Sequence, residues 1–349
     1  MKKVLLAILF LALLSVVGCT ERQRTNDSSG DARTAAQSSA GAERAAETVK
    51  EDTSASEKEE KEERMERIPS RREEFKKGLL SPRGCEGSGT FMLGASPLAL
   101  EDIEKIRPMG GLSSFHITPT DHQYWDTIGS DGRSEDTTNL ERFKVYAPGD
   151  GLIVDIEHHT DYRVVIEHSC IFYTIFIHVD KLSDKIMAAA GLKEGEVGNH
   201  AWPRIPVEEG EVIGTIGVGK LDFSVIDANV TLKGFVKPES YEGEPWKIHA
   251  VDTFDYYEEP LKSRLLDKNI RKVPPLGGKI DYDIDGRLVG TWFKENTNGY
   301  RGLGNEQYWG SHLSIVYDAI DPSQVRISIG DFGGRQGQLQ FGVKGNSPG

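Results

Sequence analysis

Two β-rich runs lie almost end to end in the middle of the chain, and this feature most constrains the fold. "RVVIEHS" (163–169) and "IFYTIFIHV" (171–179) consist largely of β-branched and aromatic residues. Two such runs a few residues apart are typical of a β-hairpin. Further runs of the same kind occur at "GLIVDIE" (151–157), "GEVIGTIG" (210–217) and "LDFSVID" (221–227). The sequence therefore predicts a mainly β fold with an antiparallel sheet as its core.

Helical periodicity is confined to two segments in this part of the chain. Apolar residues recur at helical spacing in "SPLALEDIEKI" (96–106) and in "KLSDKIMAAAGL" (181–192). We expect two short helices there, within a β domain that spans residues 84–272.

The pattern changes after the Pro- and Gly-rich break "VPPLGG" (273–278). Three alternating segments follow, "HLSIVYD" (312–318), "QVRISIGDF" (324–332) and "QLQFGVKG" (338–345), and they predict an antiparallel β meander with one buried face within a small module at 277–349. The residues expected on that buried face are Leu313, Ile315, Tyr317, Val325, Ile327, Ile329, Leu339, Phe341 and Val343.

The start of this module, "GRLVGTWF" (286–293), resembles the Gly-x-Trp start of lipocalin-like barrels. Three segments are too few for a full barrel. A carrier or scaffold built on the meander is therefore one of the functions that the sequence leaves open.

The first residues of the chain read as a secretory signal. "MKKVLLAILFLALLSVVGCT" has two lysines, an apolar run at 4–17 and a Cys directly after it. An apolar run of this length is short for a membrane-spanning helix, and a charged start before it is typical of a signal peptide. Val16-Val17-Gly18-Cys19 resembles the lipobox of bacterial lipoproteins, which implies cleavage after residue 18 and lipid attachment to Cys19. A plain signal peptide or an anchor helix is the alternative.

Residues 19–77 predict a solvated tether. They are rich in Glu, Lys, Arg, Ala, Ser and Thr, with "SEKEEKEERMER" (56–67) as the densest charged stretch. Such a composition buries too little apolar surface to offset the entropy cost of ordering. With a lipid on Cys19, the tether would hold a folded domain off a membrane, in the cell envelope and facing outward from the cytoplasm, either in a periplasm or at the cell surface.

The net charge and the cysteines exclude some classes of site. The formal charge is −13 and no basic stripe is visible, so we expect no nucleic-acid partner. Apart from Cys19, the cysteines are Cys85 and Cys170, which either pair in an oxidising envelope or remain separate thiols. No Cys-x-x-Cys or Cys/His finger spacing is present, which excludes a structural zinc site of that type.

Four segments occur in an order that resembles a known enzyme family. "APGDG" (147–151) looks like a turn that opens a sheet, and "FIHV" (176–179) looks like a tyrosine-x-histidine-leucine strand. "VEEGEVIGTIG" (207–217) resembles a Val-x-x-Gly-x-x-Ile-Gly hairpin, and "LDF" (221–223) resembles a Leu-His-Phe strand. Together they resemble the lysostaphin/LytM-type zinc endopeptidases, which have a duplicated hybrid motif and cut peptide cross-bridges of the bacterial cell wall. The resemblance covers about 110 residues, 115–227.

The resemblance implies a metal site whose residues are only partly kept. In that family a His-x-x-x-Asp segment and the second His of a His-x-His strand bind zinc, and two further histidines move protons. His178 falls on one proton-moving position. The other is Lys220 in this chain, and the last zinc ligand is Asp222.

The remaining candidate ligands lie in "SFHITPTDHQYW" (114–125). His116 and Asp121 are separated by four residues instead of three, and His122 follows directly. Either Asp121 keeps the family's Asp position, or His122 takes it while Asp222 takes that of the final His. His116, Asp121 or His122, and Asp222 would then hold zinc, or a harder metal if oxygen ligands predominate.

The competing interpretation is a remnant of such a site. The carboxylates would cap turns, the histidines would be satisfied by neighbours, and Lys220 would pair with Asp222 or Asp121. A lysine there would repel a divalent cation.

Two main functions follow from the sequence. The first is a non-catalytic envelope lipoprotein that binds cell-wall peptide or another envelope protein. The second is an active or altered metallo-endopeptidase that cleaves peptidoglycan cross-bridge peptides.

Overall fold

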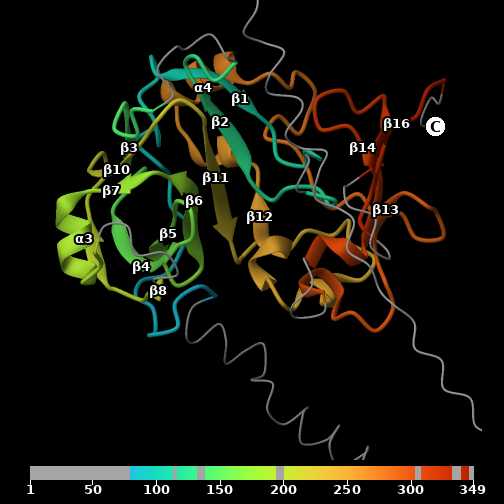
Figure 1. The fold of residues 1–349 in the computed structure, drawn as a ribbon, viewed down its shortest axis with the longest axis horizontal. Helices are drawn as coiled ribbons and strands as arrows, with labels where there is room; N and C mark the ends of the chain where they lie inside the picture. Colours follow the sequence, from blue (N-terminus) through green and yellow to red (C-terminus); the bar gives the residue numbers. More distant parts are fainter. Residues whose placement is uncertain are drawn as a thin grey trace, which may run out of the picture. The chain divides into compact units, whose positions relative to one another are not determined.

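The computed structural model describes residues 79–112, 116–131, 138–193, 200–302, 308–331 and 339–345 (Figure 1). These residues belong to one compact unit, 69–349. The predicted signal peptide (1–18), Cys19 and the tether (19–77) lie outside the described residues. In the described part, the helices are too short or too polar to cross a membrane.

A nine-stranded antiparallel sheet forms the centre of the described structure, in the order β1-β2-β11-β6-β5-β4-β8, with β12 beside β11 and β9 beside β4. Its strands are β1 (Ile103–Arg107), β2 (Gln123–Thr127), β4 (Gly151–His158), β5 (Tyr162–Ser169), β6 (Phe172–Val179), β8 (His200–Ala201), β9 (Ile205–Val207), β11 (Lys220–Asp227) and β12 (Ala250–Val251). The predicted strands at 151–157, 163–169, 171–179 and 221–227 are confirmed, and so is the hairpin of β5 and β6.

Both faces of this sheet are covered, which explains why its strands are almost continuously apolar. On β5, Val164 and Ile166 belong to a core shared with a smaller sheet, whereas Val165 belongs to a second core on the other face. The smaller sheet has the order β3-β10-β7, with β3 (Phe143–Tyr146), β10 (Val212–Ile216) and β7 (Lys181–Leu182). The predicted strand at 210–217 is thus confirmed as β10.

One of the two predicted helices is present. α3 (Asp184–Ala190) buries Ile186 and ends at Gly191, whose φ of 68° is a conformation that glycine adopts without strain. The helix expected at 96–106 is wrong, because this segment forms a turn followed by the edge strand β1. A β-bulge lies between Ile103 and Lys105. It adds one residue to the strand, so Ile103 and Ile106, three apart as in a helix, both reach the core.

Short helices connect the central sheet to the C-terminal part. They are η1 (Pro238–Tyr241), η2 (Pro245–His249), η3 (Thr253–Tyr256) and α4 (Leu261–Lys268). Proline at the first position of η2 presets its first turn, as is common at helix starts. This turn fixes the position of Lys247 on the second core.

The C-terminal sheet is the predicted antiparallel meander. Its order is β13 (Gly290–Phe293), β14 (His312–Tyr317), β15 (Val325–Ile329), β16 (Leu339–Gly342), with η4 (Gly299–Arg301) and η5 (Tyr308–Ser311) between β13 and β14. The expected buried face is largely wrong. On β14 the buried residues are His312, Ser314 and Val316, and β16 is exposed along its length. Alternation located the strands, but polar residues occupy much of the buried side.

A disulfide joins Cys85 and Cys170, which settles a pairing that the sequence left open. Cys170 lies in the turn between β5 and β6. Close by, the buried carboxylate of Glu167 accepts hydrogen bonds from the Ser81 hydroxyl and the Glu86 backbone N–H. Residues 81–86 are thereby fixed to the hairpin of β5 and β6.

Candidate functional site

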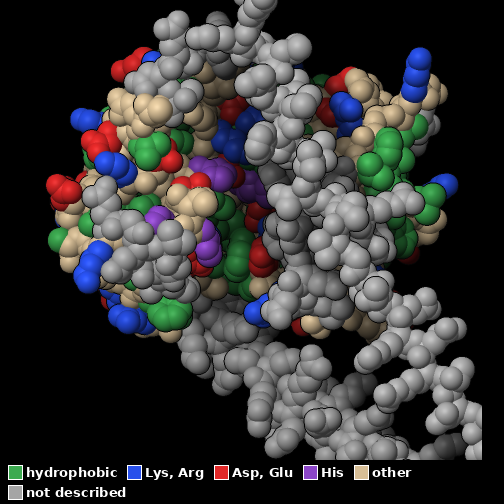
Figure 2. Space-filling view, viewed as in Figure 1, with side chains coloured by type: hydrophobic (Ala, Val, Ile, Leu, Met, Phe, Trp, Pro, Cys, Tyr) green, Lys and Arg blue, Asp and Glu red, His purple; other side chains and the backbone are tan. Residues whose placement is uncertain are grey.

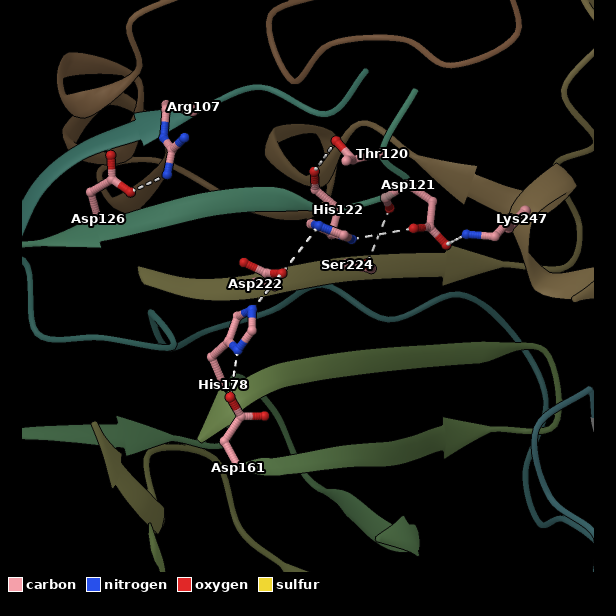
Figure 3. Close-up of polar contacts among 10 residues, drawn as sticks. All are labelled: Arg107, Thr120, Asp121, His122, Asp126, Asp161, His178, Asp222, Ser224 and Lys247. Atoms are coloured by element: carbon pink, nitrogen blue, oxygen red, sulfur yellow. Dashed lines mark hydrogen bonds and ion pairs between the residues drawn. The ribbon is translucent and has the colours of Figure 1, made fainter. Parts of the chain in front are cut away.

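Three neighbouring strands bring the candidate residues together (Figure 3). Asp222 on β11 pairs in register with Tyr124 on β2 and with Ile177 on β6. His122 lies in the turn just before β2, and its ring packs edge-on against Tyr124, with 4.9 Å between ring centroids. His178 follows Ile177 directly on β6. Residues that are distant in sequence therefore meet over the middle of the sheet.

His122 lies between two carboxylates. Its Nδ1 atom is 3.2 Å from Asp121 Oδ1, and its Nε2 atom is 3.1 Å from Asp222 Oδ2. Burial alone would lower the pKa of His122, but Asp222 and Asp121 raise it to about 9. The imidazole is therefore protonated at neutral pH, with both nitrogens directed at anions.

His178 has the same arrangement on the other side of Asp222. Its Nδ1 atom is 2.6 Å from Asp161 Oδ2, and its Nε2 atom is 3.3 Å from Asp222 Oδ2. Burial opposes the charge, but the hydrogen bonds to Asp161 and Asp222 raise the pKa of His178 to about 10. The backbone of His178 has φ of 69°, a left-handed conformation that is uncommon for residues other than glycine. Such backbone strain is frequent at functional sites.

Lys247 completes the arrangement, and the sequence analysis did not identify it. Its Nζ atom lies 2.9 Å from Asp121 Oδ2 and 3.2 Å from Glu244 Oε2, and 4.4 Å from the centre of the Tyr300 ring. Burial opposes the charge of Lys247, yet Asp121 raises its pKa well above the usual value. The same lysine holds the pKa of the Asp121 carboxyl well below its usual range, against the effect of burial.

Positive and negative groups therefore alternate through the site. We call this arrangement the ion-pair chain; its members are Glu244, Lys247, Asp121, His122, Asp222, His178 and Asp161. Burial favours a neutral Asp222, but His122 and His178 keep the pKa of this carboxyl below its usual range. Each charge inside the ion-pair chain is thus compensated by its two neighbours.

His116 lies beside the ion-pair chain. Its ring packs edge-on against His122, with 5.4 Å between ring centroids. Burial, with a contribution from the charges of His122 and Lys247, lowers the pKa of His116 to about 3, so this imidazole is neutral. Of the two sequence-based alternatives, His122 is the residue that faces Asp222, whereas Asp121 faces Lys247.

The pairing expected for Lys220 is wrong. The recorded ion pairs of Asp121 and Asp222 are with Lys247, His122 and His178, whereas the Lys220 Nζ atom lies 4.4 Å from the centre of the Tyr124 ring. The cation that neutralises Asp121 is Lys247. No local pattern reveals it, because η2 and the turn before β2 are far apart in sequence.

The residues as placed do not fit a resident metal. Among the described residues, no group of three or more His, Cys, Asp or Glu side chains has the arrangement of a metal site. Zinc binds histidine through an unprotonated ring nitrogen. The ring nitrogens of His122 and His178 instead face carboxylates, and Asp121 is neutralised by an ammonium group. Two groups remain as possible ligands, the neutral imidazole of His116 and the buried Asp222 Oδ1, which has no hydrogen-bond partner in the described part. Zinc sites use at least three protein ligands.

Comparisons with known proteins give weak similarities. No family model matches the chain, and no curated protein matches it significantly. Among solved structures, Csd3 from Helicobacter pylori has 17% identity over 40% of this chain and 30% of that chain, with a TM-score of 0.24. The solution structure of lysostaphin has 15% identity over 38% and 47% of the two chains, with a TM-score of 0.25. A zinc-containing peptidase from Vibrio cholerae has 18% identity over 38% of each chain, with a TM-score of 0.22.

The chain therefore spans less than half the length of these three structures. With TM-scores of 0.22 to 0.25, these similarities assign no family to the chain.

Proposed function

We propose that the chain is a membrane-anchored envelope lipoprotein whose central domain resembles a peptidoglycan endopeptidase but binds or regulates without catalysis. Its partner is cell-wall peptide or another envelope protein. The anchor is the lipid expected on Cys19, and the tether at 19–77 holds the domain off the membrane, outside the cytoplasm. The observation that carries the non-catalytic assignment is the ion-pair chain.

The four sequence segments that resemble the endopeptidases fall on matching structural elements. "APGDG" (147–151) leads into β4, "FIHV" (176–179) ends β6, "VEEGEVIGTIG" (207–217) includes the turn before β10, and "LDF" (221–223) lies on β11. These positions support an endopeptidase-like scaffold around the candidate site.

Electrostatics argue against a divalent ion in this site. A metal bound to Asp121 would lie close to the Lys247 ammonium, which is 2.9 Å from that carboxylate. Two unit charges 4 Å apart repel by about 4 kcal/mol at an effective dielectric of about 20, and a 2+ ion doubles this cost. The buried cations Lys247 and His122 already supply the positive charge that the carboxylates require.

The test is metal content combined with cell-wall binding and cleavage by the purified full chain. After dialysis against zinc-free buffer, we expect far less than one zinc per chain. We also expect the chain to sediment with purified cell wall, and no release of soluble peptides with or without a chelator. A matched variant, Asp255→Ala, changes an exposed carboxylate outside the site and should behave like the parent.

Stoichiometric zinc together with chelator-sensitive cleavage, both abolished by Asp222→Ala, would establish the alternative, an active metallo-endopeptidase. Anchoring is tested separately. The mature chain should carry a lipid at its N-terminal Cys19 by mass spectrometry, and Cys19→Ser should release it from membranes.

A further inference from the structure

A cavity of about 440 Å³ lies between the edge of the central sheet and the C-terminal sheet. Its volume is within the range of small-ligand sites. Arg107 and Tyr124 line one side, and Arg326 lies on the other. Phe341 and Ile320, which are 48% and 46% exposed, give the cavity an apolar wall. The cavity is distinct from the ion-pair chain, none of whose members lines it.

Cations outnumber carboxylates at the sheet side of this cavity. Arg107 Nη2 lies 2.6 Å from Asp126 Oδ1, and Lys105 Nζ lies 3.7 Å from Asp126 Oδ2. One buried carboxylate thus meets two cations. The Nε atom of Arg107 is itself buried, and it has no hydrogen-bond partner within the described ranges.

A third cation lies on the same face of the sheet. Lys220 Nζ and Arg107 Cζ are each 4.4 Å from the centre of the Tyr124 ring, so the two charged groups are separated by no more than twice that distance. The structure records no carboxylate within ion-pair distance of Lys220 among the described residues. Figure 2 shows Lys and Arg side chains next to the histidines on the face drawn. The local excess of positive charge contrasts with the formal charge of −13 for the whole chain.

Across the cavity, Arg326 is already neutralised. Its Nε atom lies 2.7 Å from Asp318 Oδ2. Arg107 shares the carboxylate of Asp126 with Lys105, so its charge is less completely compensated than that of Arg326. Because Arg107 Nη2 already donates to Asp126, a carboxylate in the cavity would meet the remaining accessible N–H groups of the guanidinium through charge-assisted hydrogen bonds.

We propose that this cavity binds the carboxyl-terminal end of a short peptide, with the carboxylate on Arg107 and the last side chains against Tyr124, Ile320 and Phe341. The inference rests on the proposed binding function, for which it names the ligand class. A cell-wall peptide ending in a D-amino acid and a protein tail ending in an L-amino acid share this chemistry.

The experiment measures binding of N-dansyl-tetra-alanine to the full chain by fluorescence anisotropy. One form of the peptide has a free C-terminal carboxylate, and the other has a C-terminal amide. The free acid should bind about tenfold to hundredfold more tightly than the amide, because a charge-assisted hydrogen bond is lost in the amide. The acid is prepared in an all-L and an all-D version. Tighter binding of the all-D peptide would point to a cell-wall peptide, and tighter binding of the all-L peptide would point to a protein tail. Equal binding of acid and amide, or no binding of either, would overturn the proposal.

Variants locate the binding site. Arg107→Gln should reduce the preference for the acid to less than about threefold, whereas Arg107→Lys should keep part of it. Lys144→Gln, at an exposed lysine on β3, is the matched control and should leave the preference unchanged. The ratio of acid to amide affinity within one variant does not depend on the fraction of folded protein.

An unchanged ratio in Arg107→Gln would refute the site. Zinc content and cleavage do not enter this test, so a failure here is distinguishable from a failure of the non-catalytic assignment.

Discussion

Replacing Lys247 by methionine tests whether the ion-pair chain holds the site together. The side chains of Lys247 and Asp121 are only 8% and 10% exposed, and their charged atoms are 2.9 Å apart. Removing one partner of a buried ion pair costs about 3–5 kcal/mol, because it leaves an uncompensated charge. Asp121 would keep His122 at 3.2 Å, so we expect the lower end of this range, about 3 kcal/mol.

The free energy of unfolding is measured by urea unfolding monitored by circular dichroism. A thermal melt gives the Tm as a second measurement. For a compact unit that spans residues 69–349, a loss of about 3 kcal/mol corresponds to a Tm lowered by about 5 °C. The matched control is Lys262→Met. The ion pair of Lys262 with Asp255 is 3.5 Å long, and the two side chains are 32% and 71% exposed. An exposed pair of this kind contributes less than about 1 kcal/mol.

A double variant separates the pair from other effects. Asp121→Asn in the Lys247→Met background removes the uncompensated carboxylate while keeping its shape. The double variant should therefore be destabilised by less than the sum of the two single variants. The reasoning fails if Lys247→Met stays within about 0.5 kcal/mol of the parent, a difference typical of ordinary surface changes, or if the two single losses add.

Three further predictions follow from the same structure. The pKa of His122 is raised above the unfolded value of about 6.5. The protonated imidazole therefore contributes about 3 kcal/mol to the free energy of unfolding, and this contribution is complete below about pH 6.5. It should be lost as the pH rises through about 9, seen as a falling urea midpoint between pH 7 and 10. Asp222→Asn should lower the pKa of both His122 and His178, and imidazole NMR titrations in which both pKa values stay at 9 or above would contradict this. Replacing Cys85 and Cys170 by serine opens a loop with a sequence separation of 85 and should cost about 4 kcal/mol; an unchanged urea midpoint would argue against it.

The central sheet was predictable because its strands are buried on both faces. Continuous β-branched and aromatic runs such as 163–169 have few other uses in a domain of this size. The helix predicted at 96–106 was wrong because Ile103 and Ile106 are three residues apart, as on one face of a helix. The bulge in β1 lets both of them face the core from a strand. In the meander, alternation located β14 and β15 but not their buried side, because Ser314 and Ser328 are buried.

Part of the candidate site could also be predicted. The resemblance to the endopeptidase motifs singled out His122, Asp222 and His178, and the structure brings them into contact. Lys247 and Asp161 could not be found this way. They belong to no recognisable spacing, and they reach the site only through the packing of η2 and of the turn between β4 and β5.

The Cys85–Cys170 disulfide also determines how the domain would respond to mechanical tension. A pull on the chain from its N-terminal side arrives at Cys85 and passes through the covalent bond to the turn between two inner strands of the sheet. Residues 86–169 carry none of that load, so the edge strand β1 is not peeled away first. Reduction of the bond would direct the same force through the bridges of Leu93 and Leu98 toward the edge strand β1.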